Sequence, residues 1–439
     1  MTPPTHDLTS TEARVLAAID VDGLLDTISR LVAIPTDRGR ETPAQEQMAE
    51  WMARAGMNVD VWEIDFEELA AHPRFSIEIE RGRSLGVVGS LGRADGSLGG
   101  TGPRGGRSPG RSLILNGHID VVPAGDVSRW TVPPWQGTIR DGNLVGRGAL
   151  DMKGALCCGL YAVRAIVDAG VELDGQLLLQ SVIAEEDGGA GTLAAIQRGY
   201  AADGAVVIEP TCLSLAPAHA GALNFRIHVR GRSAHGALRT EGVSAIDGFI
   251  PIYRALQALE ARRNSGVRDP LFAHYDVPFP LSVGTVRAGE WASNVPESLC
   301  FEGRYGVAVG EEPAEAQAMF EQAVAEAARS DPWLERYPPK VEWWGGQFHP
   351  AATDPSDPIV RTVAGAFRDI EGREPRIEGM PYGADMQLLV NVGGTPTVMF
   401  GPGDVRNAHR PDEWVPIAEL ETVTRTLALT ALRFCGHGG

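Results

Sequence analysis

Acidic and histidine side chains follow apolar segments at five places along the chain. His118 and Asp120 end the segment LILNGHID, and Asp151 in GRGALDMKG comes just before a predicted helix. The remaining residues of this kind are Glu185 and Glu186 after LLLQSVIA, Glu209 in AVVIEP and His409 in FGPGDVRNAHRPDEW. A carboxylate buried at a strand end is unfavourable unless it is paired or bound to a cation. Several carboxylates and two histidines at such positions therefore predict a metal site.

These donors indicate which metals and which chemistry to expect. Imidazole and carboxylate without thiolate suit zinc, cobalt or manganese. A bridging carboxylate commonly holds two ions about 3.5–4 Å apart around one water molecule, which is an arrangement for hydrolysis. Glu185 and Glu186 are adjacent, so their side chains point in different directions. One can bind a metal while the other faces the water as a base, and Asp120 is expected to orient His118.

Each of these residues taken singly need not bind a metal, because a lone acid or histidine is more often part of a capped turn or of the surface. Their order along the chain, each beside an apolar segment, favours the metal site. Other histidines lack this context. His6, His72, His228 and His437 are interpreted as surface or filling residues, and His349 stays undecided.

The first part of the chain is expected to contain helices and strands before the polar residues begin. Apolar residues at helical spacing predict a helix over 24–32, and Thr42-Pro43 predicts the start of a second helix that stops near Gly56. Residues 59–64 and 75–80 alternate as strands do. The stretch 89–111 is rich in Gly, Arg and Ser and is interpreted as a surface loop. A phosphate cradle is the alternative, but the stretch lacks a Walker-type ending.

From Ser112 onward, apolar segments alternate with helical ones. The order is LILNGHIDVV, a helix from about 153 to 169, QLLLQSVIA and AVVIEP, which predicts an α/β sheet. Open α/β sheets place their sites at the carboxyl ends of strands. The polar residues described above stand at those ends, so the sheet is expected to bring them together.

The pattern changes after about Leu213. Strands are predicted over 222–229, 281–288, 298–309 and 340–344, and helices over 244–262 and 314–329. This β-α-β-β-α-β order is the ferredoxin-like pattern. We expect residues 215–346 to form an inserted α+β ferredoxin-like domain, and residues 1–214 and 347–439 to form the two parts of an α/β catalytic domain.

Composition excludes several classes of protein. The net charge of −18 disfavours binding to nucleic acid or to anionic membranes, and no apolar run approaches the ~20 residues of a membrane span. The first ten residues are polar, with Pro3 and Pro4, so no secretory signal is expected. The five cysteines are odd in number and form no CxxC pair, which disfavours a disulfide framework and predicts a cytoplasmic protein.

The segments GHIDVVP, GRGALDMKG, AEEDGG, IEPT and AHRPDE occur in this order, and over about residues 24–433 the chain resembles the M20 metallopeptidase family. That family includes acetylornithine deacetylase, succinyl-diaminopimelate desuccinylase, aminoacylase and a bacterial glutamate carboxypeptidase. The chain is most similar to the acetylornithine deacetylase and desuccinylase-like branch. The resemblance implies a zinc-peptidase-like catalytic domain, with the inserted domain serving as a lid and for dimerisation.

The resemblance also implies a role for each residue of the constellation. It implies two zinc ions, with cobalt or manganese as alternatives, and a cis peptide bond between Asp151 and Met152. Glu185 would be the general base, taking a proton from water and passing it to the leaving nitrogen. The implied metal residues are His118 and Glu209 for one ion, Glu186 and His409 for the other, Asp151 between them, and Asp120 in support of His118.

Four residues of the later chain match substrate-contacting positions of the family. His235 in GRSAHG would reach the site of the partner subunit in a homodimer and stabilise the oxyanion. Asn294, Arg304 and Gly383 would contact substrate, the arginine through a carboxylate. Each also has a plain interpretation: a histidine after a strand is usually a surface or turn residue, and Arg304 could form a surface salt bridge.

The chain departs from relatives that read Asp-x-Arg after the glycine turn, because Gln387 stands at the arginine position. We expect a metal-dependent hydrolase of an N-acyl amino acid or related N-acyl amine, with a small or peptide-like substrate. A deformylase of a formylated aminopyrimidine in thiamin salvage is an alternative, since a neutral ring would tolerate Gln387. A dipeptidase or carboxypeptidase is another, and a metal-binding pseudoenzyme is the non-catalytic one.

Overall fold

The described residues, 8–92 and 110–438, divide into two compact units in a computed structural model. The larger unit comprises Met1–Ala218, Ala352–Glu378 and Ala384–Gly439, and the inserted unit comprises His219–Ala351 and Gly379–Gly383. The inserted unit thus begins four residues after the expected boundary at 215 and ends five residues after the one at 346. It also takes a short second segment from the later chain.

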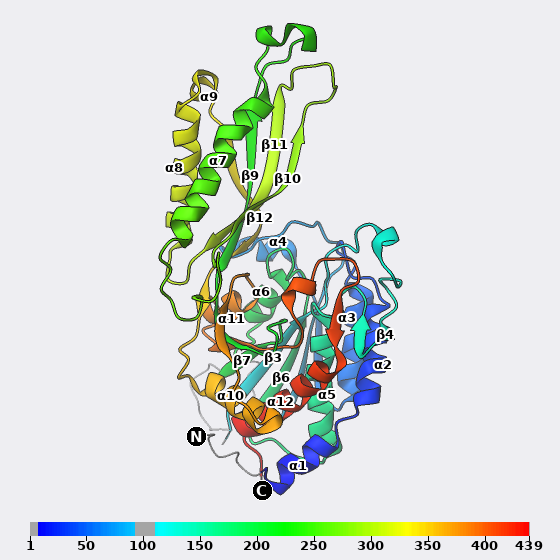
Figure 1. The fold of residues 1–439 in the computed structure, drawn as a ribbon. Helices are drawn as coiled ribbons and strands as arrows, with labels where there is room; N and C mark the ends of the chain where they lie inside the picture. The colour runs from blue at the N-terminus through cyan, green and yellow to red at the C-terminus, as the bar shows by residue number, and fades with distance from the viewer. Residues whose placement is uncertain (1–7, 93–109, 439) are drawn as a thin grey trace. The chain divides into compact units, whose positions relative to one another are not determined.

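A mixed sheet forms the centre of the larger unit (Figure 1). β3 pairs in parallel with β6 and β7, and these strands are almost wholly buried because both faces of the sheet are covered. Within the described residues the sheet has nine strands, in the order Asn58–Glu63 (β1), Leu85–Gly92 (β2), Gln176–Val182 (β6), Ser112–His118 (β3), Gly204–Val207 (β7), Thr397–Met399 (β15), Leu215–His219 (β8) and Ala351–Ala352 (β13), with Ile377–Met380 (β14) also paired to β8.

Helices cover this sheet. The predicted helix after Asp151 is α5, which packs against β3 and lies beside α2 and α12 (Figure 1). Its buried face joins one continuous apolar core with these neighbours. The α-helices of the larger unit are Ser10–Ala17 (α1), Val21–Val32 (α2), Thr42–Arg54 (α3), Phe66–Leu69 (α4), Lys153–Asp168 (α5), Ala190–Gln197 (α6), Pro358–Glu371 (α10), Met386–Asn391 (α11) and Ile417–Cys435 (α12). The α/β class is confirmed.

A small sheet joins two distant parts of the larger unit. Its strands are Thr138–Arg140 (β4), Asn143–Val145 (β5) and Trp414–Pro416 (β16), in the order β16-β5-β4. Trp414 lies opposite Val145 in this pairing. The segment that carries His409 is therefore held beside the segment that leads to Asp151.

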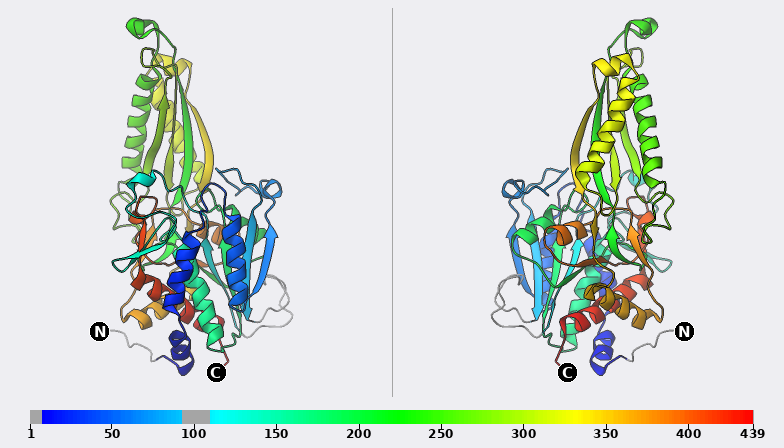
Figure 2. Two further views of the ribbon diagram at one scale, coloured as in Figure 1. Left: turned by 90° about the vertical axis from the view of Figure 1, so that its right-hand side faces the viewer. Right: turned by 90° about the vertical axis from the view of Figure 1, so that its left-hand side faces the viewer.

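The inserted unit has the predicted ferredoxin-like pattern. Its strands are Gly221–Arg230 (β9), Leu281–Ala288 (β10), Ser298–Val307 (β11) and Lys340–Phe348 (β12), all antiparallel in the order β10-β11-β9-β12. The helices are Ala245–Asn264 (α7), Pro313–Arg329 (α8) and the short Pro332–Arg336 (α9). α7 and α8 cover one face of the strands (Figure 2), where Phe225, Phe301 and Phe320 form the core.

Two predictions about the early chain were wrong. Residues 75–80 form no strand, because the N–H groups of Glu78 and Ile79 donate to the carboxylate of Asp187 instead of to a neighbouring strand. The strand lies further on, in β2, which includes Gly89–Gly92 of the predicted loop. Residues 93–109 of that loop lie outside the described residues. No helix in the described part of the chain is long and apolar enough to cross a membrane.

Candidate metal centre

Three neighbouring parallel strands end at one edge of the large sheet. His118, the last residue of β3, lies opposite Val182 of β6, and Asn116 lies opposite Val207 of β7. Glu185 comes three residues after the end of β6 and Glu209 two residues after the end of β7, so they reach the same edge as His118. The structure therefore brings these side chains together at the strand ends, as predicted.

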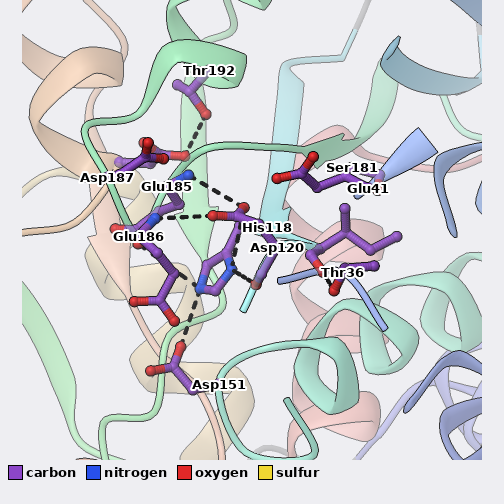
Figure 3. Close-up of polar contacts among 12 residues, drawn as sticks. Thr36, Glu41, His118, Asp120, Asp151, Ser181, Glu185, Glu186, Asp187 and Thr192 are labelled. Atoms are coloured by element: carbon purple, nitrogen blue, oxygen red, sulfur yellow. Dashed lines mark hydrogen bonds and ion pairs between the residues drawn. The ribbon is translucent and has the colours of Figure 1, made fainter. Parts of the chain in front are cut away.

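His118 stands at the centre of one group of acids (Figure 3). Its Nε2 lies 3.1 Å from Oδ1 of Asp151, 3.7 Å from Oε1 of Glu209 and 4.0 Å from Oε2 of Glu185. In the sets formed by His118 with Glu185 and Glu209, and by His118 with Asp151 and Glu186, the nearest ligand atoms lie within 4.8 Å of one another. Such a group can surround a cation.

Asp151 joins this group to a second one. Its other oxygen, Oδ2, lies 3.3 Å from Nε2 of His409, which is itself 3.1 Å from Oε2 of Glu186. Burial alone would raise the pKa of Asp151, but the contacts with His118 and His409 hold that pKa below its usual value. An anionic carboxylate with one oxygen toward each histidine is suited to lie between two ions.

The acids of this centre fit a divalent metal. The five carboxyl side chains are at most 13% exposed, and Oε1 of Glu186 has no hydrogen-bond partner among the described residues. Burial raises the pKa of Glu185, and the nearby Glu209 raises it further. Burial and Asp151 likewise raise the pKa of Glu209. So much buried negative charge is stabilised by bound cations, and nitrogen and oxygen donors without thiolate suit zinc, cobalt or manganese.

Asp120 supports the centre through its backbone as well as its side chain. Its carbonyl oxygen lies 2.8 Å from Nδ1 of His118, which fixes the ring and leaves Nε2 facing the acids. Its carboxylate lies 3.7 Å from the same nitrogen. The two carboxylate oxygens accept the backbone N–H groups of Glu185 and Glu186, at 3.2 and 3.1 Å. Asp120 therefore holds the turn that follows β6 in addition to the ring.

Glu413 is a supporting residue that the sequence reasoning missed. Its Oε1 accepts the N–H groups of Gly148, Leu150 and Asp151 at 2.9, 3.0 and 3.1 Å, and its other oxygen pairs with the guanidinium of Arg147. Glu413 and Arg147 are both buried. Glu413 lies inside the motif AHRPDE, which was the available sign of its role. The expected cis peptide bond between Asp151 and Met152 is present.

Sequence comparison identifies the family to which this centre belongs. A family model described as Peptidase family M20/M25/M40 matches residues 114–433. The chain belongs to this family. The M20 resemblance is thereby confirmed, and with it the prediction of a metal-dependent hydrolase, so the non-catalytic alternative is set aside.

Relatives within the M20 family hydrolyse different amides. The N-formyl-4-amino-5-aminomethyl-2-methylpyrimidine deformylase of Halalkalibacterium halodurans is 29% identical over 450 residues, which cover 96% of this chain and 97% of the relative. The acetylornithine deacetylase of Myxococcus xanthus is 30% identical over 336 residues, or 76% of this chain and 83% of the relative.

Solved structures of peptidases share the fold at low identity. A di-peptidase from Saccharomyces cerevisiae superimposes with a TM-score of 0.75 at 13% identity, over 97% of this chain and 99% of that one. A tripeptidase from Staphylococcus aureus gives a TM-score of 0.70 at 19% identity, over 95% and 99% of the two chains. These similarities support the M20 fold and carry no information about the substrate.

The four substrate-contact candidates of this M20 chain all lie in the inserted unit. His235 and Asn294 are brought together there by an isolated β-bridge between their backbones. Nδ1 of His235 accepts the N–H of Ala237 at 3.1 Å, so in the neutral ring Nε2 carries the proton and can donate it outward. The His235 side chain is exposed. This geometry suits a hydrogen-bond donor.

Arg304 and Gly383 belong to the same unit. One guanidinium nitrogen of Arg304 donates to the carbonyl of Pro381 at 3.2 Å, and within the described residues no carboxylate pairs with it. Burial lowers the pKa of this arginine. A side chain at Gly383 would meet Cβ of Phe348 at 2.3 Å, so glycine is required there. The plain interpretation of Arg304 as a surface salt bridge is not supported.

Gln387, which the sequence resemblance places at the position of an arginine, lies on α11 in the larger unit. Its side chain is 1% exposed, and neither its amide oxygen nor its amide nitrogen has a hydrogen-bond partner among the described residues. Buried amides are normally satisfied, and one that is not calls for a partner such as water or a ligand. The amide of Gln387 offers two N–H donors and an acceptor oxygen without charge.

Proposed function

We propose that the chain is an amidohydrolase that uses two divalent metal ions. It would remove an acyl group from a small N-acyl amine that carries no carboxylate, and the preferred acyl group would be formyl. The observation that carries this proposal is Asp151, whose two oxygens face His118 and His409 at 3.1 and 3.3 Å. His118 and Glu209 would hold one ion, and Glu186 and His409 the other. Zinc is the first candidate and cobalt or manganese the alternatives.

The reaction would use few groups of the protein. When bound, the two ions supply Lewis acidity to the amide carbonyl and to water. Glu185 takes the proton from the attacking water and delivers it to the leaving nitrogen. Its burial favours this role, because a carboxyl group whose pKa is raised can hold the proton between the two steps. His235 donates a hydrogen bond through Nε2 to the oxygen that becomes negative.

The substrate class is inferred from two features. The pyrimidine deformylase of H. halodurans aligns over 96% of the chain, and its named substrate has an amine without a carboxylate. The amide of Gln387, which has no hydrogen-bond partner among the described residues, supplies neutral donors and an acceptor at the position where the sequence resemblance expects an arginine. Both features favour an N-formyl or other N-acyl derivative of a neutral aminopyrimidine.

A second candidate is an N-acyl amino acid, which was our first expectation from the sequence. Arg304 supports it, since a guanidinium without a carboxylate partner in the described residues can bind the carboxylate of an amino acid. The acetylornithine deacetylase of M. xanthus, which covers 76% of the chain, supports it as well. A dipeptide remains a third and weaker candidate.

A homodimer formed through the inserted unit would complete the proposed site, with His235 provided by the partner subunit. Ile246, Ile250 and Tyr253 lie on one face of α7 and are 44%, 42% and 37% exposed. β10 is an edge strand whose free side can pair with another strand.

We also propose a cytoplasmic location. All five cysteines lie in the described residues and are free thiols.

The test compares hydrolysis of N-formyl and N-acetyl aminopyrimidines, N-acetyl and N-succinyl amino acids, and dipeptides, with zinc, cobalt or manganese added. We expect the highest kcat/KM on the N-formyl aminopyrimidine. Glu185→Gln should lower kcat by at least about 10²-fold while metal content is unchanged. If the Glu185→Gln variant still hydrolyses the substrate with metal bound, Glu185 is not the general base.

A further inference from the structure

An irregular segment, Phe75–Arg81, lies against the turn that carries Glu185 and Glu186. We call this segment the strap. The backbone N–H groups of Glu78 and Ile79 donate to Oδ2 of Asp187 at 3.0 and 2.8 Å. At its start, a Cβ placed on Gly188 would come within 2.3 Å of Oγ of Ser76. The strap and the turn therefore touch along their length.

Arg81, at the end of the strap, binds Asp187 with a fork of two hydrogen bonds. Its NH1 and NH2 groups donate to Oδ2 and Oδ1 of Asp187, both at 2.8 Å. Nε donates to Oε1 of Glu41 at 3.1 Å, and NH1 also donates to the carbonyl of Ile79 at 3.0 Å. The Arg81 side chain is 1% exposed. The guanidinium is thus buried and has four acceptor contacts.

Asp187 follows directly after Glu185 and Glu186 (Figure 3). The turn is therefore held from two sides. On one side, the carboxylate of Asp120 holds the N–H groups of Glu185 and Glu186. On the other, the carboxylate of Asp187 is held by Arg81 and the strap. The backbone at Ala184 has a φ of +61°, which is unfavourable for a residue with a side chain. Such a backbone persists when its surroundings determine it.

We propose that Arg81 is a positioning residue of the metal centre: by fixing Asp187 it sets the directions in which Glu185 and Glu186 point. This inference rests on the proposed roles of these two glutamates. The fork of a guanidinium fixes a carboxylate in direction as well as in distance, which an ammonium group does not do. Loss of the fork would let the turn rotate, and Glu186 would no longer lie 3.1 Å from His409.

The alternative is that Arg81 only stabilises the fold, as many buried ion pairs do. The two accounts differ in what happens to metal binding. If Arg81 acts on the turn, its substitution weakens metal affinity in a protein that is still folded. If it acts only on stability, unfolding becomes easier and the affinity of the folded protein is unchanged.

The experiment titrates Co²⁺ into the metal-free full chain and follows the absorption of the bound ion. We expect Arg81→Met to weaken Co²⁺ affinity about 10- to 100-fold, which is the usual effect of removing a supporting partner of a metal ligand. Arg81→Lys should fall between Arg81→Met and wild type, because it keeps the charge and loses the fork. Should Arg81→Met fail to fold, Arg81→Lys alone decides, and wild-type affinity for it would overturn the proposal.

A double substitution tests whether the two residues act as one unit. Asp187→Asn alone should weaken Co²⁺ binding to a similar extent as Arg81→Met. The double variant should then bind Co²⁺ about as tightly as the single variant with the lower affinity, because the second substitution removes an interaction that is already lost. If the loss of Co²⁺ affinity in the double variant equals the product of the two single losses, the residues act independently and the proposal is wrong.

Arg433→Gln is the matched control. Arg433 bonds Glu12 and Asp369, each at 2.7 Å, and has no part in the strap or the turn. We expect it to lower the melting temperature and leave Co²⁺ affinity unchanged. If Arg81→Met lowers only the melting temperature in the same way, the positioning role is wrong. A wild-type chain that binds Co²⁺ but hydrolyses no amide would refute the proposed function, while the affinities would still decide the role of Arg81.

Discussion

The side chain of Glu413 accepts a hydrogen bond from the backbone N–H of Asp151, with the two atoms 3.1 Å apart. Through this bond a residue of the last part of the chain fixes the acid that lies between the two histidines. The same Glu413 pairs with the buried Arg147. The position of Asp151 therefore depends on an ion pair that is closed to water.

Glu413→Gln is predicted to destabilise the protein by about 3–5 kcal/mol, because it leaves the charge of Arg147 buried without its partner. The measurement is unfolding by denaturant. Arg30→Gln, which breaks an exposed pair with Asp26, is the control and should change stability by less than about 1 kcal/mol. A Glu413→Gln variant as stable as this control would contradict the argument.

His235→Ala is predicted to lower kcat by about 10²–10³-fold and to leave the metal content unchanged, because a donor to a developing oxyanion acts in the transition state. Kinetics and metal analysis of the same preparation provide the test. Asn294→Ala, which alters the residue bridged to His235, serves for comparison and should have a smaller effect on kcat. Equal losses of turnover and metal after His235→Ala would show that the residue supports the fold or the metals instead.

Gln387→Arg is predicted to shift the substrate preference of the enzyme toward substrates that carry a carboxylate. The kcat/KM for an N-acetyl amino acid, relative to that for an N-formyl aminopyrimidine, should rise at least about 10-fold, since an added guanidinium favours a carboxylate. Gln387→Leu removes the amide without adding charge, so it should reduce activity on the neutral amide without a gain on the acid. An unchanged ratio in Gln387→Arg would show that this position does not select the substrate.

His219 gives a prediction about pH. Burial lowers the pKa of this histidine to about 4, and its Nδ1 lies 2.9 Å from the carbonyl of Ala220. Above pH ~6.5 the ring is neutral in both the folded and the unfolded chain, so it adds no pH dependence. As pH falls from ~6.5 toward 4, only the unfolded chain takes up the proton, and stability declines by at most about 1.4 kcal/mol per pH unit.

The measurement compares the free energy of unfolding of wild type and His219→Gln between pH 7 and pH 4. The difference between the two proteins isolates His219 from the acids that titrate in the same range. We expect the wild type to lose more stability on acidification than the variant. Parallel curves would show that His219 is protonated in the folded protein as readily as in the unfolded chain.

The strand-end residues of the centre were predictable because an α/β sheet makes their meeting a consequence of topology. His118 and Glu209 end or follow adjacent parallel strands, and no other information was needed to bring them together. The α/β class and the ferredoxin-like unit followed in the same way from the periodicity of apolar residues and from the order of the elements.

Two supporting residues, Arg81 and Glu413, were not predicted, because their partners are distant in sequence and their contacts depend on irregular backbone. Arg81 meets Asp187 at a separation of 106 residues, and Glu413 meets Asp151 at a separation of 262. Residues 75–80 alternate as a strand does, but Asp187 accepts two of their N–H groups, so local pattern and tertiary contact disagree there.

The central claim is that Asp151 lies between two metal ions. Anomalous X-ray diffraction at the zinc absorption edge, from crystals of the zinc-loaded protein, tests it most directly. We predict two anomalous peaks beside the carboxylate of Asp151, one next to His118 and Glu209 and the other next to Glu186 and His409. A single peak, or peaks that leave Asp151 without contact to both ions, would contradict the two-metal account.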